Sequence, residues 1–322
     1  MEYRELGRTG WKISAIGIGT WAMGSAWGET DDELSLATLN RALDLGVNFF
    51  DTADVYGSEH LLADLKRQRS EPFYVATKMG VRVNPDPAGY TRENITRFTD
   101  ESLRNLGTDA IDLMQLHVPP PEVYNAETFG ILDDLVAAGK IRHYGVSVER
   151  IVDAERAIQF PGVQSVQIVF NIFRQRPADA FFAEAAARGV GILARVPLAS
   201  GMLTGKMSAS TTFAADDHRS YNRHGESFDQ GETFAGVDFE TGLAAVEELR
   251  ALVPPGMSMA QMALRWILMF DDVACTIPGA RRPSQAEDNI AAAEMPPLSA
   301  ETMAQIRAIY DRHIRAQVEN RW

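Results

Sequence analysis

Cysteine is almost absent from the 322-residue chain, which contains only Cys275. A single cysteine excludes a disulfide within the chain and is typical of proteins that stay in a reducing compartment. Long apolar runs are absent too, since no stretch reaches the roughly 20 residues that a membrane-spanning helix requires. Residues 1–6 are too polar for a signal peptide. We therefore expect a soluble, cytoplasmic protein in which Cys275 is a small core residue.

Basic residues are also fewer than acidic ones. The chain carries 31 Lys and Arg residues against 44 Asp and Glu residues, which leaves a net charge of −13. An acidic surface repels phosphate backbones, so nucleic acid is excluded as the main partner. We find no metal-ligand spacing and expect no metal site among His60, His143, His218, His224 and His313. Instead, we expect a small-molecule substrate, no membrane partner, and a monomer or small homo-oligomer.

The chain does contain a regular alternation of short apolar segments and amphipathic ones. Residues 2–14 predict a β-hairpin that turns at 7–10. The segments expected to form strands are 16–20, 47–51, 73–78, 111–117, 141–147, 165–170, 190–196 and 273–278. Those expected to form helices are 30–46, 58–67, 91–106, 126–138, 149–158, 178–187, two helices after residue 239, then 284–292 and 299–316.

Eight buried strands separated by helices predict a parallel sheet, and eight such units favour a closed barrel over an open sheet. No linker rich in Ser, Pro or Gly divides the chain. We therefore predict an α/β fold in which residues 1–322 form a single (β/α)8 TIM barrel. It has an N-terminal hairpin over 2–14, two extra helices, and a C-terminal helix over 299–316. The long polar segment 207–239 either folds over bound ligands or is a mobile loop without a contact role.

Polar residues follow the apolar segments at the ends where such a barrel carries function. Asp51 ends one expected strand and Tyr56 lies five residues further on, while Lys78 and His117 end the next two strands. A buried ammonium requires a partner, and Asp51 can be the partner of Lys78. The ammonium is then expected to lower the pKa of the Tyr56 phenol, which is ordinarily near ~10.

These four residues can polarise a carbonyl group and protonate its oxygen, with His117 donating a hydrogen bond to that oxygen. None of them is a hydride donor, so a cofactor must supply the electrons. Taken singly, each has a simpler interpretation: Asp51 can cap a helix, Tyr56 can be a surface aromatic, and His117 can be a core residue. The joint pattern at three strand ends favours the catalytic interpretation.

The chain resembles the aldo-keto reductase family over nearly its whole length. The family's tetrad of Asp, Tyr, Lys and His is matched by Asp51, Tyr56, Lys78 and His117. Further family motifs are matched, in order, by Gly17-Ile18-Gly19-Thr20-Trp21, Gly145-Val146-Ser147, residues 197–206, Ala263-Leu264-Arg265-Trp266 and Ile277-Pro278-Gly279-Ala280. The resemblance implies an oxidoreductase that reduces an aldehyde or ketone to an alcohol with NADPH. In that family the Tyr is the general acid, Lys and Asp tune it, and His orients the carbonyl.

The same resemblance implies where the cofactor binds. Ser147 and Gln167 are expected to hold the nicotinamide carboxamide, and Gly201, Leu203 and Lys206 to lie along the pyrophosphate. The adenosine end is expected to be surrounded by Arg281, Gln285, Asp288 and Asn289. The full expected set is Gly19, Thr20, Trp21, Asp51, Ser147, Gln167, Arg195, Pro197, Leu198, Ser200, Gly201, Leu203, Lys206, Gly279, Ala280, Arg281, Gln285, Asp288 and Asn289.

Some positions depart from the family's pattern. Many members place an aromatic residue at position 195 to stack on the nicotinamide; Arg195 can stack too, but it adds positive charge. Val148 stands where Asn is usual, so one amide contact is lost. A Lys and an Arg common near the last strand are replaced by Gly279 and Gln285.

The cation for a 2′-phosphate can come instead from Arg281 and Arg282, or these two can be a solvated pair. We therefore expect NADPH (and NADP+) as the cofactor, with NADH also allowed.

Several alternative interpretations stay open. Some relatives of the family are NADPH-binding regulatory subunits of membrane channels with little turnover. A barrel isomerase or lyase would use Lys78 as a Schiff-base amine, although an amine beside Asp51 should stay protonated. Residues 17–22 fit a dinucleotide-binding fingerprint, but a loop is expected over 23–28 where that turn needs a helix. Trp21, Tyr90 and Trp27 can line a substrate pocket or be partly buried loop aromatics.

Overall fold

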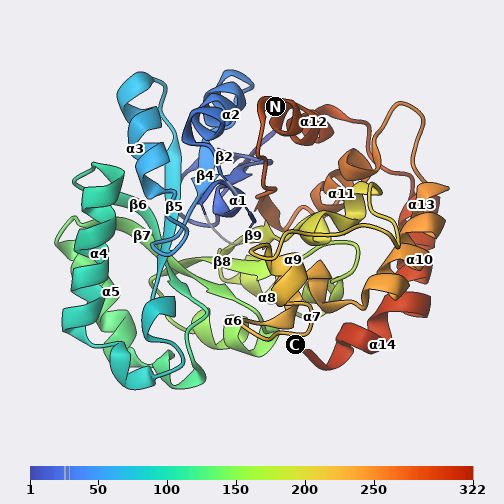
Figure 1. The fold of residues 1–322 in the computed structure, drawn as a ribbon. Helices are drawn as coiled ribbons and strands as arrows, with labels where there is room; N and C mark the ends of the chain where they lie inside the picture. Colours follow the sequence, from blue (N-terminus) through green and yellow to red (C-terminus); the bar gives the residue numbers. More distant parts are fainter. Residues whose placement is uncertain (25–26, 29, 322) are drawn as a thin grey trace.

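The computed structural model describes residues 1–24, 27–28 and 30–321, and it shows a parallel eight-stranded sheet surrounded by helices (Figure 1). Each strand pairs with the next in chain order. The strands are β3 (Ile18–Gly19), β4 (Phe49–Asp51), β5 (Tyr74–Met79), β6 (Ile111–His117), β7 (Ile141–Val148), β8 (Val163–Val169), β9 (Gly191–Arg195) and β10 (Val273–Thr276).

The sheet closes on itself where its first and last strands meet. Ile16 bridges Thr276, and Gly19 bridges Gly279, both in the parallel sense. The backbone amide of Gly17 also donates to the Thr276 carbonyl at 2.9 Å. The predicted (β/α)8 barrel is therefore confirmed, although most observed strands differ from the predicted segments by one or two residues at an end.

Helices follow most of the strands and pack around the barrel. They are α1 (Trp21–Gly24), α2 (Asp32–Asp44), α3 (Glu59–Gln68), α4 (Arg92–Leu106), α5 (Ala126–Ala137), α6 (Ile151–Ala157), α7 (Arg176–Ala180), α8 (Phe182–Ala187), α9 (His218–Tyr221), α10 (Phe239–Arg250), α11 (Met259–Leu268), α12 (Pro283–Ala291), α13 (Ala300–Ile309) and α14 (Arg315–Val318). Helix α11 begins with a capping box at Ser258 and Gln261, with both reciprocal bonds formed.

Four local predictions about helices need correction. The helix predicted over 30–46 begins two residues later, at Asp32, because the Asp31 carboxylate caps it by accepting from the Leu34 amide. The helix predicted over 178–187 is broken at Phe181 into α7 and α8. The final helix continues through a π-helical turn at Tyr310–Ile314 into α14. One helical turn, α1, occupies part of the loop expected over 23–28, whose residues 25 and 26 lie outside the described residues.

The N-terminal hairpin covers the barrel at the amino ends of the strands. It consists of β1 (Tyr3–Glu5) and β2 (Lys12–Ser14), which pair antiparallel as predicted. Leu6 and Ile13 pack against inward-facing barrel residues in a small separate core, which includes Phe49, Leu113, Leu193 and Cys275. Gly7 has a φ of +52°, and a side chain there would meet the Gly189 carbonyl, so the hairpin can approach this closely only with glycine.

Strand alternation decides which residues reach the open, carboxyl end of the barrel. Because alternate side chains share a face, Phe49 and Asp51 both point inward from β4. The first is buried in the lower core and the second lies two residues nearer the rim. β5 repeats the arrangement with Ala76 and Lys78. The apolar layer therefore fills the bottom of the barrel and a polar layer lies above it.

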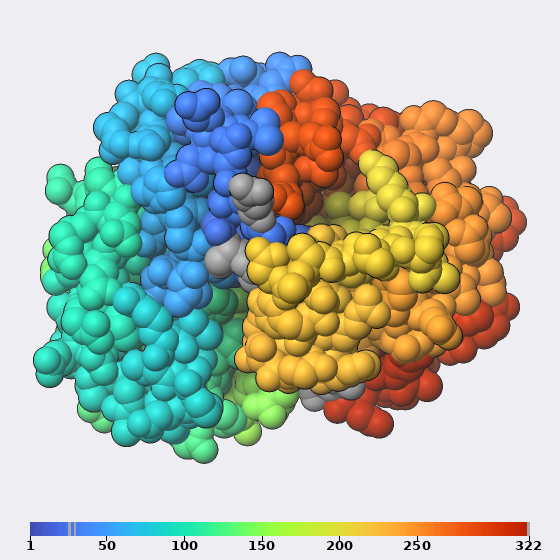
Figure 2. Space-filling view, viewed as in Figure 1, coloured from blue at the N-terminus to red at the C-terminus, as the bar shows by residue number. Residues whose placement is uncertain are grey.

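The segment 207–239 contains more structure than a polar loop predicts. It includes α9 and two single turns, over Gln230–Glu232 and Phe234–Gly236. Trp27 forms an antiparallel bridge with Asp217, which ties this segment to the loop after β3. In the space-filling view the molecule is hollowed near its middle, between this yellow segment and the blue N-terminal part (Figure 2). No helix within the described ranges is long and apolar enough to cross a membrane.

Candidate active site

A buried ion pair lies at the carboxyl end of neighbouring strands β4 and β5. The Lys78 ammonium donates to the Asp51 carboxylate at 2.5 Å and to the Thr52 carbonyl at 2.8 Å. Lys78 is 1 % exposed, so its charge has little access to water. Burial lowers the pKa of Lys78, and attraction to Asp51 opposes that shift in part. The predicted partnership of these two residues is present in the geometry.

Three polar side chains from β6, β7 and β8 complete this layer. The Gln167 amide donates to the second oxygen of Asp51 at 2.7 Å, and the Gln115 amide donates to the same oxygen at 3.4 Å. The Ser147 hydroxyl donates to the Gln167 carbonyl oxygen at 3.3 Å. Because both Asp51 oxygens accept hydrogen bonds, the carboxylate is held rigidly in a buried place.

Tyr56 lies above this pair on the loop that follows β4. The Lys78 ammonium is 4.9 Å from the centre of the Tyr56 ring, and the His117 ring is 5.9 Å from it. The prediction that a neighbouring ammonium lowers the pKa of Tyr56 is wrong for this structure. Burial raises the pKa well above its usual value, and the Asp51 and Glu232 carboxylates raise it further. The phenol therefore keeps its proton at neutral pH.

His117 ends β6 beside Tyr56. Burial lowers its pKa well below the usual value, and the positive charges of Lys78 and Arg195 lower it further. The imidazole is therefore neutral at pH 7. Its Nδ1 is buried without a hydrogen-bond partner among the described residues. Tyr56 and His117 thus form an uncharged pair at the end of the barrel.

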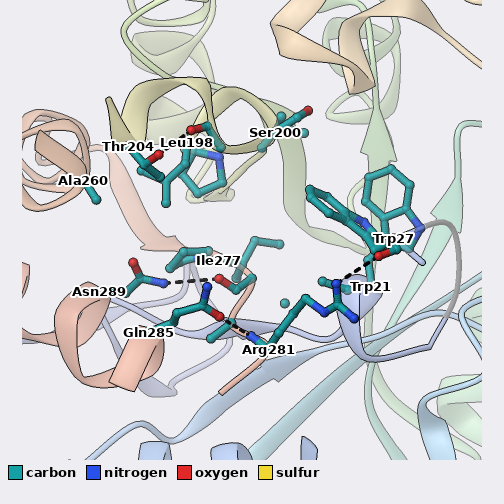
Figure 3. A pocket seen from close by; sticks show the side chains of 18 of the residues that line it. Trp21, Trp27, Leu198, Ser200, Thr204, Ala260, Ile277, Arg281, Gln285 and Asn289 are labelled. Carbon is teal, nitrogen blue, oxygen red and sulfur yellow. Dashed lines mark hydrogen bonds between the residues drawn. The ribbon is translucent and has the colours of Figure 1, made fainter. Parts of the chain in front are cut away.

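A cavity of about 830 Å³ opens beside Tyr56 and runs away from the barrel axis. Figure 3 shows Leu198, Ser200 and Thr204 on one side of it and Ile277, Gln285 and Asn289 on the other. The predicted cofactor residues that line it are Gly19, Trp21, Asp51, Gln167, Arg195, Pro197, Leu198, Ser200, Gly201, Lys206, Gly279, Ala280, Arg281, Gln285, Asp288 and Asn289.

Three predicted cofactor residues are not placed at the cavity wall. Thr20 is buried, with its hydroxyl bonded to the Asp51 carbonyl and the Ser58 hydroxyl. Leu203 is buried in the main apolar core. Ser147 reaches the cavity only through Gln167. Tyr90, considered for a substrate pocket, bonds Asn84 and does not line the cavity, whereas Trp21 and Trp27 do.

The far end of the cavity is held by a network around α12. The Arg281 guanidinium donates to the Trp27 carbonyl at 3.0 Å, and the Arg281 amide donates to Gln285 at 2.8 Å. Asp288 accepts from Gln261 at 2.8 Å, and Asn289 donates to the Gly279 carbonyl at 3.2 Å. Asp288 and Asn289 are thus partly engaged within the protein, while Arg281 and Arg282 line the cavity with positive charge.

The structure adds cavity residues that are not in the expected cofactor set. They are the motif residues Thr204, Ile277 and Pro278, together with Ala22, Thr30, Asp31, Leu34, Ser35, Val196, Met207, Arg219, Glu232 and Ala260. Among them Glu232 forms an ion pair with Arg195. The two residues are far apart in the chain, and no spacing rule links them. Across the described part of the chain, no group of three or more His, Cys, Asp or Glu residues is placed to hold a metal ion.

Comparisons with known proteins agree with this geometry. The sequence model described as the Aldo/keto reductase family matches residues 15–311. Aldo-keto reductase YhdN of Bacillus subtilis is 33 % identical over 89 % of this chain and 87 % of its own. Aldo-keto reductase yakc [NADP(+)] of Schizosaccharomyces pombe is 28 % identical over 93 % and 89 %.

A solved structure is similar as well. The glycerol dehydrogenase AKR11B4 of Gluconobacter oxydans superposes with a TM-score of 0.81 at 29 % identity, covering 97 % of this chain and 96 % of that one. The match of the family model over nearly the whole chain, together with the barrel and the residues at its rim, leads to one conclusion. The chain belongs to the aldo/keto reductase family and is an oxidoreductase of that family.

Proposed function

We propose that this protein reduces an aldehyde or ketone to an alcohol by hydride transfer from NADPH, with Tyr56 as the general acid. One observation carries the proposal. Asp51, Tyr56, Lys78 and His117 come from three neighbouring strands and their loops and lie close together, and two of them, Asp51 and Tyr56, line a cavity of about 830 Å³. Nothing in this set can donate a hydride, so a second ligand must do so.

The cavity fits such a cofactor in size and in chemistry. Its volume of about 830 Å³ is within the roughly 300–1,000 Å³ typical of ligand sites. At the Tyr56 end, the Gln167 amide would hold the carboxamide, and the buried Nε of Arg195 has no partner among the described residues. At the far end, Arg281, Arg282 and Lys206 would hold phosphate groups. The relative named yakc [NADP(+)] supports the choice of cofactor.

The chain's own residues supply the proton. When bound, NADPH provides the hydride that adds to the carbonyl carbon. Tyr56 then donates its proton to the carbonyl oxygen as that oxygen gains negative charge, which completes the alcohol. The neutral His117 orients the oxygen by a hydrogen bond. The Lys78 ammonium, 4.9 Å from the ring, stabilises the phenolate that remains, and Asp51 holds Lys78 in place.

The experiment that tests this proposal compares the protein with Tyr56→Phe. We expect NADPH consumption with 4-nitrobenzaldehyde in the parent and a loss of about 10²–10⁴-fold in kcat in the variant. NADPH affinity should be retained, because the phenol oxygen is not among the groups proposed to hold the cofactor.

Equal kcat values for the parent and Tyr56→Phe would overturn the assignment of Tyr56. NADPH binding without turnover across a panel of aldehydes and ketones would instead favour a regulatory, cofactor-sensing role. A complete lack of NADPH binding would remove the proposal altogether.

A further inference from the structure

The wall of the cavity next to Tyr56 contains a charged residue with a dedicated counter-ion. Arg195 ends β9 and lines the cavity, and its charge influences both Tyr56 and His117. One end of its guanidinium donates to Glu232 and the other donates to the Val148 carbonyl at 2.9 Å. Arg195 is 9 % exposed and Glu232 14 % exposed on their side chains, so water screens this pair weakly.

Glu232 is held in this place by the segment that carries it. The Ser200 hydroxyl donates to the Glu232 carbonyl at 2.8 Å and accepts from the Phe234 amide at 3.1 Å. The turn Gln230–Glu232 therefore positions the carboxylate beside Arg195, and this turn is hydrogen-bonded to the 199–204 turn after β9. The guanidinium plane is fixed at both ends, and only its buried Nε is left without a partner in the described ranges.

Other charged groups near Arg195 do not replace this counter-ion. Glu149 lies close enough to influence Arg195, but burial together with the Asp229 and Glu232 carboxylates raises the pKa of Glu149 to about 8. Glu149 is therefore mostly protonated at neutral pH. Arg174, which acts on Glu149, carries positive charge and cannot be a counter-ion. Glu232 is thus the carboxylate that neutralises Arg195 when the pH is near 7.

We propose that Glu232 determines which oxidation state of the nicotinamide this protein binds more tightly. The inference rests on the proposed function, because hydride delivery to a carbonyl held by Tyr56 requires the nicotinamide beside Tyr56 and hence beside Arg195. The nicotinamide ring is positively charged in NADP+ and neutral in NADPH. An uncompensated guanidinium in this place would repel NADP+ alone, whereas the pair with Glu232 presents little net charge to either form.

The test measures the dissociation constants of NADP+ and NADPH by calorimetry, with no substrate and no turnover. In Glu232→Gln, the ratio of the NADP+ constant to the NADPH constant should rise at least about tenfold, equivalent to ~1.4 kcal/mol. In Arg195→Gln the lone Glu232 carboxylate should attract NADP+, and the ratio should fall. Local structural damage would be expected to change the ratio in the same direction in both variants. Opposite changes in the ratio therefore point to the charges of Glu232 and Arg195 themselves.

Glu149→Gln is the matched control, because it replaces a buried and mostly uncharged carboxyl nearby. Its ratio should equal that of the parent. Glu149→Gln combined with Glu232→Gln should raise the ratio at least as far as Glu232→Gln alone, since Glu149 can then no longer ionise to replace the lost charge.

An unchanged ratio in Glu232→Gln, or shifts of the same sign in both single variants, would overturn the inference. These results are separate from failure of the proposed function, which would appear as a parent protein that binds neither NADP+ nor NADPH.

Discussion

At the scale of single residues, burial sets the charge of Tyr56 and His117, the two groups proposed to face the carbonyl. It raises the pKa of Tyr56 and lowers the pKa of His117, so both are uncharged proton donors at neutral pH. A low-dielectric site of this kind makes each hydrogen bond to a developing oxyanion stronger than it would be in water. In the proposed reaction, Asp51 largely balances the charge of Lys78 until proton transfer leaves a phenolate beside it.

Glu149 gives a pH-dependent prediction at this scale. Its pKa is raised from about 4.5 to about 8 by burial and by nearby carboxylates, so between these values the folded protein binds more protons than the unfolded chain. The free energy of unfolding therefore falls as the pH rises through this window. Glu149→Gln cannot ionise and should escape this loss. We expect the variant to melt at nearly the parent's temperature at about pH 5 and at least ~2 °C above it at about pH 8.5.

Thermal denaturation of both proteins in one buffer series measures this difference. Asp54→Asn is a useful comparison, because the pKa of Asp54 is raised only to about 6. The gain in melting temperature of Asp54→Asn over the parent should therefore stop increasing at a lower pH than that of Glu149→Gln. A Glu149→Gln advantage in melting temperature that is the same at both pH values would show that folding does not raise the pKa of Glu149.

The sequence could predict the position of a site residue where that position is fixed by the strand that carries it. Asp51, Lys78 and His117 are each at the carboxyl end of an apolar segment, and parallel strands bring such ends together. The ion pair of Arg195 with Glu232 could not be predicted, because it depends on how the segment 207–239 folds back. The direction of the Tyr56 pKa was missed too, because burial sets it first, then the Asp51 and Glu232 carboxylates, and burial depends on how the whole barrel packs.

At the scale of elements, α1 can pack against the Tyr56 loop only because Gly24 has no side chain. A methyl group at Gly24 would lie 1.7 Å from the Tyr56 carbonyl oxygen, which is backbone and cannot rotate away. Gly24→Ala should therefore displace the Tyr56 loop. We expect a clear fall in kcat with 4-nitrobenzaldehyde and a stability loss of about 1–3 kcal/mol.

Gly130→Ala provides the matched control for this substitution. Gly130 is also helical, within α5, but a methyl group there would meet no atom within 4 Å. Alanine should stabilise this helix by about 0.5–1 kcal/mol and leave kcat unchanged. Steady-state kinetics and urea denaturation of the two variants give both quantities. A Gly24→Ala protein with the parent's kcat would mean that α1 does not hold the Tyr56 loop.

Element boundaries were predictable where local signals decide them. α4 begins after the Thr91 cap and ends at Gly107, which has a φ of +59°. The break between α7 and α8 has no such signal, because Phe181 is a reasonable helix residue. Its side chain is buried in the main core and its backbone leaves the helical region there. Local propensity alone would have continued the helix through Phe181, so tertiary packing determines this break.

At the scale of the whole molecule, the barrel follows from the order of its segments, but the cavity does not. Eight apolar segments separated by helices are enough to predict a closed parallel sheet. The cavity wall, in contrast, combines residues from Gly19 to Asn289, contributed by both ends of the chain and by the 195–207 region. Only the resemblance to a family indicated most of these residues in advance. A ligand that fills this cavity should stabilise the fold as a whole.

The far end of the cavity should distinguish NADPH from NADH through charge. Arg281 and Arg282 are exposed and line the cavity, so a 2′-phosphate would meet two guanidinium groups there. We expect the double substitution Arg281→Gln, Arg282→Gln to weaken NADPH binding about tenfold or more, equivalent to ~1.4 kcal/mol, and to change NADH binding little. Thermal-shift titrations with both cofactors measure this, and Arg92→Gln on α4 controls for loss of a surface charge. Equal losses for NADPH and NADH would place the 2′-phosphate elsewhere, because only a group that NADH lacks can produce a difference between them.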